Sequence, residues 1–207
     1  MLISEKHKYL YIHVYKVAGQ SVKLALRRQE YRHLPLVRTP LAILLESPLA
    51  YTFRPLGPHA SAREIRDLLG ADAFASYFKF AFVRNPWDWQ VSLFHFIQQN
   101  KLNHQRRLVS SMTFDEYIEW RVTEDRHLQS EYLCDRHGDL LVDFVGRYER
   151  LAQDFNEVSS RLGLETSLPH VNATSHRDYR SYYDDRTKAL VADAFAEDIE
   201  RFGYSFG

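Results

Sequence analysis

Apolar residues along the chain gather in two short, almost continuous runs, at residues 9–14 and 80–83. Neither run alternates with polar residues, and this pattern predicts strands that are covered on both faces, as in a parallel sheet. A helix of about 19–30 is predicted after the first run. A second helix, from the Asn85–Pro86 start signal to about Gln99, follows the second run. Repeated strand–loop–helix units predict an α/β fold, in which helices flank a central parallel sheet.

Capping residues and apolar periodicity mark the remaining elements. Ser61 with Glu64, and Thr113 with Glu116, each form the capping-box pattern that begins a helix. Five prolines within residues 31–58 interrupt any long helix there and predict an irregular segment. The other predicted elements are a short strand near 51–53, a polar and basic loop at 100–111, a strand at 140–144, and helices at 149–162 and 184–201.

Length and composition narrow the class of protein. A chain of 207 residues has the size of one domain, so we expect a single domain over residues 1–207. Basic and acidic residues balance at 27 each, whereas a general nucleic-acid binder would be basic, so no nucleic-acid partner is expected. The single cysteine, Cys134, excludes an internal disulfide and fits a reducing compartment. Because no apolar stretch reaches membrane-spanning length and no signal peptide is recognisable, we expect a cytoplasmic protein without a membrane span.

The two strand–loop–helix junctions carry the residues that could bind an anion. Lys16 and Gly19 lie in the loop before the first helix, whose first N–H groups and dipole favour negative charge. Gly19 would let the backbone approach a phosphate closely, and Lys16 would add a full charge. Arg84 follows the second strand directly. Because ligands of parallel sheets bind at the carboxyl ends of strands, we expect Lys16 and Arg84 to converge on one anion.

These two stretches resemble the cofactor motifs of the sulfotransferases that use 3′-phosphoadenosine 5′-phosphosulfate (PAPS), most closely the carbohydrate type and its bacterial members. The family pattern HVPKTGGTS corresponds to HVYKVAGQS at residues 13–21, and FVRNPWDR corresponds to FVRNPWDW at residues 82–89. Ser92 falls at the family's spacing, and residues 145–151 and 182–204 add further agreement. The resemblance covers nearly the whole chain and implies the family's fold, a P-loop, nucleoside-kinase-like α/β domain.

The resemblance also implies an activity, the transfer of a sulfuryl group from PAPS to a carbohydrate or small-molecule hydroxyl, with no metal required. It assigns the 5′-phosphosulfate to Lys16, Gly19, Gln20 and Ser21, and the 3′-phosphate to Arg84, Ser92 and Arg177. Lys16 would also stabilise the charge that develops on the leaving phosphate oxygen. His59, on the segment that follows the first predicted helix, resembles the histidine that serves as base in some relatives; His13 and Glu64 are the alternatives.

Three departures from the family pattern leave other functions open. Tyr15 replaces a proline, and Val17 and Gln20 replace threonines, so two hydroxyl groups are lost from the loop. An ATP-dependent small-molecule kinase would share this type of sheet, although the Walker spacing is absent. A non-catalytic module that binds a nucleotide or glycan is the second alternative. We expect the variable segments 31–58 and 100–112 to build the acceptor site.

Overall fold

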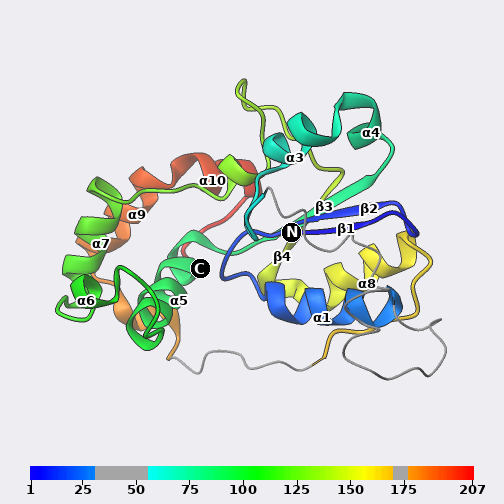
Figure 1. Cartoon of the computed structure of the whole chain (residues 1–207). Helices are drawn as coiled ribbons and strands as arrows, with labels where there is room; N and C mark the ends of the chain where they lie inside the picture. Colours follow the sequence, from blue (N-terminus) through cyan, green and yellow to red (C-terminus); the bar gives the residue numbers. More distant parts are fainter. Residues whose placement is uncertain (31–55, 170–176) are drawn as a thin grey trace. The chain divides into compact units, whose positions relative to one another are not determined.

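The structure is a computed structural model that describes residues 1–30, 56–169 and 177–207 (Figure 1). The chain divides into two compact units, one formed by Met1–Val83 with Glu131–Val171 and the other by Arg84–Ser130 with Asn172–Gly207. The strand predicted near 51–53 lies outside the described residues. The prediction of a single domain over residues 1–207 stays a prediction.

The described residues of the first unit form a four-stranded sheet in the order β1-β2-β3-β4. Its strands are β1 (Leu2–Ser4), β2 (Tyr9–Ile12), β3 (Phe78–Val83) and β4 (Phe144–Arg147). The strands β2, β3 and β4 run parallel, so their carboxyl ends lie at one edge, while β1 pairs with β2 in the antiparallel direction. The predicted α/β fold with a mostly parallel sheet is therefore confirmed. The antiparallel edge strand β1 was not predicted, because three residues are too few to show a period.

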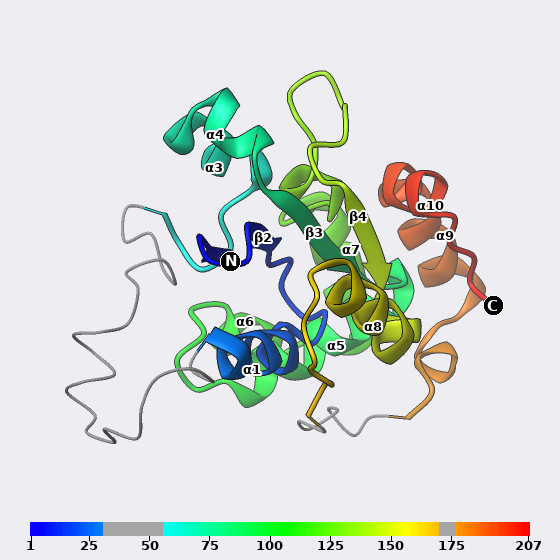
Figure 2. The ribbon, with the colours of Figure 1, turned by 90° about the vertical axis from the view of Figure 1, so that its right-hand side faces the viewer.

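Burial on both faces explains the continuous apolar runs. Every residue of β2 is buried, and so is every residue of β3 except Phe78. The rings of Tyr11 and Phe80, on neighbouring strands, stack with centroids 5.2 Å apart. The helices α1 (Gly19–Glu30) and α8 (Leu151–Arg161) lie on one side of the sheet, while α3 (Ala62–Leu69) and α4 (Ala71–Ala75) lie on the other (Figures 1 and 2).

The last strand is displaced from its predicted position. A strand was expected at 140–144, but β4 spans Phe144–Arg147, and Leu140 makes only an isolated bridge with Cys134. The reason is local, since the Asp135 carboxylate accepts hydrogen bonds from the N–H groups of His137 (2.8 Å) and Asp139 (3.0 Å). These bonds form a turn, which leaves Leu140 exposed.

The second unit is helical in its described residues. It contains α5 (Pro86–Gln99), α6 (Arg106–Val109), α7 (Phe114–Thr123), α9 (Asp185–Ala194) and α10 (Ala196–Phe202), with short 3-10 helices at Ser130–Tyr132, on the boundary of the units, and Tyr179–Tyr182. The predicted start of α5 is confirmed, because the Asn85 side chain accepts a hydrogen bond from the Trp87 N–H at 3.1 Å. The capping boxes that begin α3 and α7 also form as predicted. A turn of helix, α6, interrupts the loop that was expected at 100–111.

The C-terminal helix predicted as one element is two helices, separated at Phe195. Phe195 is fully buried and its ring meets Trp89 edge to face, with centroids 6.3 Å apart. After the break, Asp198 accepts hydrogen bonds from the N–H groups of Gln129 (2.7 Å) and Ser130 (2.9 Å). These partners are about seventy residues away in the chain, so helical periodicity alone could not reveal the break.

Candidate active site

The loop between β2 and α1 contains two residues with a left-handed backbone conformation. Lys16 and Ala18 have φ angles of 62° and 59°, in the left-handed region that non-glycine residues rarely occupy. Such residues persist where the surrounding structure requires them, often at ligand sites. The loop closes with hydrogen bonds from the N–H groups of Ser21 (3.0 Å) and Val22 (3.3 Å) to the Ala18 carbonyl. Turns of this kind present successive N–H groups to one side, where they can bind an anion.

The first turn of α1 follows this loop directly. It carries no acidic residue, so no side-chain charge opposes an anion at the positive end of the helix dipole. Gln20 is exposed, Lys16 is half-buried, and Ser21 is buried in the first turn. Val17 is fully buried in the core, so the residue that replaces the family's first threonine contributes to packing.

Gly19 makes a close contact that the sequence did not predict. A Cβ atom at this position would overlap the Nε2 and Cδ2 atoms of His13. No side chain fits between the helix start and this ring. The expected approach of the Gly19 backbone to a phosphate remains a prediction, whereas its approach to His13 is a feature of the fold.

His59 lies beside the same loop and is half-buried. Its Nδ1 is 2.9 Å from the backbone oxygen of His13. A carbonyl oxygen can only accept, so Nδ1 carries the proton and Nε2 has the free electron pair in the neutral ring. Burial lowers the pKa of His59, mainly because the charged ring loses solvent. His59 is therefore a neutral imidazole whose tautomer suits a proton acceptor.

The two alternative bases are held in other roles. His13 is only 6% exposed, and burial, with smaller contributions from Lys23 and His59, lowers its pKa to about 2. The Glu64 carboxylate accepts hydrogen bonds from both the N–H and the hydroxyl of Ser61, at 2.8 Å each, and the backbone bond lowers its pKa. His13 is enclosed and Glu64 caps α3, so His59 is the best placed of the three candidates.

The second unit contains Arg84, just before α5, and Asp88 and Ser92 on α5, at four-residue spacing. Arg84 is 3% exposed, and its Nε donates a 2.7 Å hydrogen bond to Asp88. Its backbone N–H and carbonyl are both bonded to the Gln129 side chain, at 2.9 and 2.7 Å. Ser92 is fully buried, and its Oγ has no hydrogen-bond partner in the described parts of the chain. An unsatisfied buried hydroxyl is costly, and the role of Ser92 as a phosphate ligand stays a prediction.

Arg177 also belongs to the second unit. Its guanidinium lies 5.6 Å from the centre of the Tyr182 ring, and the Tyr182 hydroxyl is 2.9 Å from Nε2 of His95. The neighbouring residues 170–176 lie outside the described residues. The predicted phosphosulfate residues thus lie in the first unit and the predicted 3′-phosphate residues in the second. The convergence of Lys16 and Arg84 stays a prediction.

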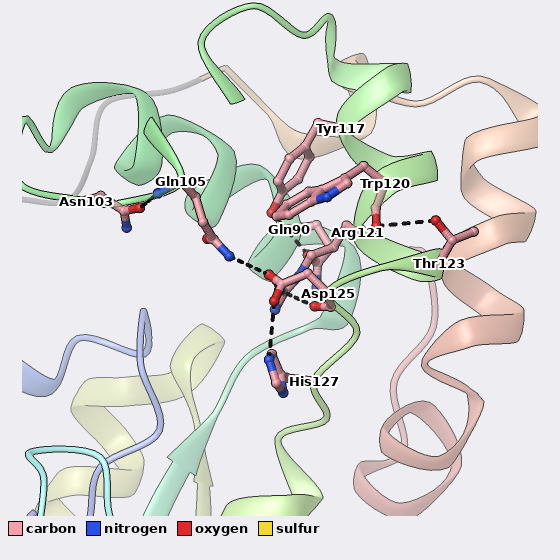
Figure 3. Close-up of polar contacts among 9 residues, drawn as sticks. All are labelled: Gln90, Asn103, Gln105, Tyr117, Trp120, Arg121, Thr123, Asp125 and His127. Atoms are coloured by element: carbon pink, nitrogen blue, oxygen red, sulfur yellow. Dashed lines mark hydrogen bonds and ion pairs between the residues drawn. The ribbon is translucent and has the colours of Figure 1, made fainter. Parts of the chain in front are cut away.

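A buried polar network that supports α5 was missed at the level of sequence (Figure 3). Arg121 is almost fully buried on α7 and donates from Nε to the Gln90 side-chain oxygen at 3.2 Å. Its guanidinium also pairs with Asp125, which accepts a second bond from Gln105 Nε2 at 3.0 Å. The network ties the helix that carries Ser92 to α7. Its only signal in the sequence is the four-residue spacing of Arg121 and Asp125, which is common on exposed helices.

Comparison with known proteins identifies the class. The model of the "Sulfotransferase family" matches residues 1–205, so the chain belongs to the sulfotransferase family and is a transferase. An uncharacterized protein of Archaeoglobus fulgidus is 29% identical over 118 residues, which cover 56% of this chain and 93% of that protein. The mostly parallel sheet with flanking helices agrees with the sulfotransferase fold.

Within residues 1–30, 56–169 and 177–207, no cluster of three histidine, cysteine or acidic side chains could hold a metal ion. None of the helices in those ranges combines the length and apolar character needed to cross a bilayer.

Proposed function

We propose that the protein transfers a sulfuryl group from PAPS to a hydroxyl group of a carbohydrate or small-molecule acceptor and releases adenosine 3′,5′-bisphosphate. The membership of the sulfotransferase family supports sulfuryl transfer in general. The observation that carries the proposal is the left-handed loop at Lys16 and Ala18, followed by a helix start without acidic residues. This loop is suited to the phosphosulfate end of the donor.

The donor would be divided between two sets of residues. Lys16, Gly19, Gln20 and Ser21 would hold the phosphosulfate through backbone N–H groups, the lysine charge and the Gln20 amide. Arg84, Ser92 and Arg177 would hold the 3′-phosphate. The unsatisfied Ser92 hydroxyl fits that role, because a phosphate oxygen would accept its hydrogen bond. A 3′-phosphate site would also distinguish PAPS from ATP.

His59 would accept the proton of the acceptor hydroxyl at Nε2, the nitrogen left free by the bond of Nδ1 to His13. The acceptor oxygen forms a bond to sulfur as the bond from sulfur to the bridging phosphate oxygen breaks, in line. That oxygen leaves with the electron pair and becomes part of the bisphosphate product. Lys16 and the helix start stabilise the negative charge that grows on the leaving oxygen. General-base catalysis by a residue such as His59 raises the rate about 10²–10⁴-fold.

Thermal unfolding with nucleotides tests the donor. A ligand at a hundred times its dissociation constant stabilises the protein by about 2.7 kcal/mol, which for a chain of this size raises Tm by roughly 5–10 °C. We expect this shift with adenosine 3′,5′-bisphosphate and no comparable shift with adenosine 5′-monophosphate. A shift only with ATP and magnesium would favour a kinase. If no nucleotide had an effect, a non-catalytic module would be the better description.

A further inference from the structure

We propose that His13 is a positioning residue that ties the phosphosulfate loop to the base, so that donor and acceptor are aligned through one buried ring. The inference rests on the proposed function and adds a residue to it. Sequence reasoning considered His13 only as an alternative base. Its contacts point to a different task.

The backbone of His13 sets the chemical state of His59. The carbonyl oxygen of His13 accepts the hydrogen bond from His59 Nδ1 at 2.9 Å. His13 follows directly after β2, which is buried along its whole length and paired with strands on both sides. The acceptor oxygen therefore lies one residue beyond a buried strand that is paired on both sides, and its bond selects the Nδ1–H tautomer of His59.

The side chain of His13 joins this bond to the donor loop. Its ring lies 4.5 Å, centre to centre, from the ring of His59, with the planes 35° apart. Its Nε2 and Cδ2 occupy the space where a Gly19 side chain would begin. The ring thus contacts the first residue of α1 as well as the base. Movement of the helix start against this ring would be passed on to His59.

Tyr15 encloses the base from another direction. Its ring meets His59 edge to face, with centroids 6.0 Å apart, and meets Tyr132 in the same manner at 5.8 Å. His59 is therefore held by neighbours on the loop that would carry the donor. In-line transfer depends on this alignment, because a displacement of 1 Å can cost about 100-fold in rate.

His13→Ala tests the proposal because it removes the ring and keeps the carbonyl oxygen. Nitrogen NMR of the histidine rings reports the His59 tautomer in the ligand-free protein. We expect wild type to show Nδ1–H alone. His13→Ala keeps the carbonyl but removes the ring that packs against His59. The His59 ring should then leave that carbonyl part of the time, and we expect a mixture of tautomers. Turnover of PAPS should fall about 10- to 100-fold, while the affinity for adenosine 3′,5′-bisphosphate changes less than about threefold. His13→Phe, which keeps a planar ring, should restore the wild-type tautomer.

Gly19→Ala tests the same contact from the helix side. The added methyl group would collide with the His13 ring, so this variant should lose stability and disturb the His59 signal. In the double variant with His13→Ala the methyl group has room, and much of the stability should return. Gly57→Ala is the matched control, because a Cβ at Gly57 meets no atom within 4 Å. It should leave the His59 signal unchanged.

Two results would overturn the inference: an unaltered His59 tautomer in His13→Ala, or stability losses of Gly19→Ala and His13→Ala that simply add. If His13→Ala does not fold, Gly19→Ala and His13→Phe still decide the question. The tautomer is measured without donor, so its outcome is separate from the fate of the proposed function. Failure of the bisphosphate to bind would refute PAPS as donor and leave the coupling between Gly19, His13 and His59 to be judged by NMR.

Discussion

Replacement of Ser92 by alanine should make the ligand-free protein more stable and its complex with adenosine 3′,5′-bisphosphate weaker. Ser92 lies in the middle of α5 and is fully buried, and its hydroxyl has no partner in the described parts of the chain. A hydroxyl buried in this way loses its hydrogen bonds to water, and no bond within the described residues replaces them. If the 3′-phosphate is its partner, the cost is recovered only when the donor is bound.

The magnitude follows from the size and surroundings of the group. An unsatisfied buried hydroxyl costs about 1–3 kcal/mol, and alanine is the better helix former by a few tenths of a kcal/mol. The small void left by one oxygen atom offsets part of this gain. A net stabilisation of about 1–2 kcal/mol corresponds to a Tm higher by roughly 2–8 °C. Loss of a hydrogen bond to a charged phosphate should weaken binding by about 1.5–3 kcal/mol, or roughly 10- to 150-fold.

The assay is thermal and urea unfolding of wild type and variant, each with and without the bisphosphate. Ser159→Ala is a matched control, because Ser159 is a buried helical serine of the first unit whose hydroxyl also has no partner in the described parts of the chain. It should gain a similar stability without any change in binding. A less stable Ser92→Ala, or one that binds the bisphosphate as wild type does, would refute the reasoning.

Three more predictions concern the base, the cap of α3 and the support of α5. His59→Ala should lower turnover about 10²–10⁴-fold and keep the bisphosphate-induced Tm shift. Burial lowers the pKa of His59, so wild-type turnover should decline only below about pH 6.5, as the ring gains its proton. Glu64→Ala should leave turnover unchanged and lower the free energy of unfolding, measured in urea, by about 1 kcal/mol. The pKa of Glu64 is lowered in the fold, so its contribution is present above about pH 4.3 and is lost as the pH falls through that lowered pKa. Arg121→Ala should lower the free energy of unfolding by about 3–5 kcal/mol, because it leaves the Asp125 carboxylate without its buried partner. Arg107→Ala, at an exposed position, should lower it by less than about 0.5 kcal/mol. Similar unfolding curves for the two variants would contradict this account.

Part of the candidate site could be read from the sequence because its chemistry is local. The lysine and glycine of the first loop lie within four residues of each other, between an apolar run and a helix start. Arg84 follows its strand directly. The contact between His59 and His13 could not be predicted from local sequence, since the two residues are 46 positions apart and no periodicity links them. The same holds for the 31 positions between Gln90 and Arg121.

By itself the sequence determined the two buried strands, the capped helix starts and the class of fold. Strands buried on both faces are continuous apolar runs, and a helix start is decided within about four residues by its cap, as at Asn85 and Thr113. Tertiary structure decided the rest: the antiparallel direction of β1, the break at Phe195, and the contact of Gly19 with the His13 ring. The physical reason is one of range. Capping and periodicity act between near neighbours, whereas packing selects among distant partners that only the folded chain brings together.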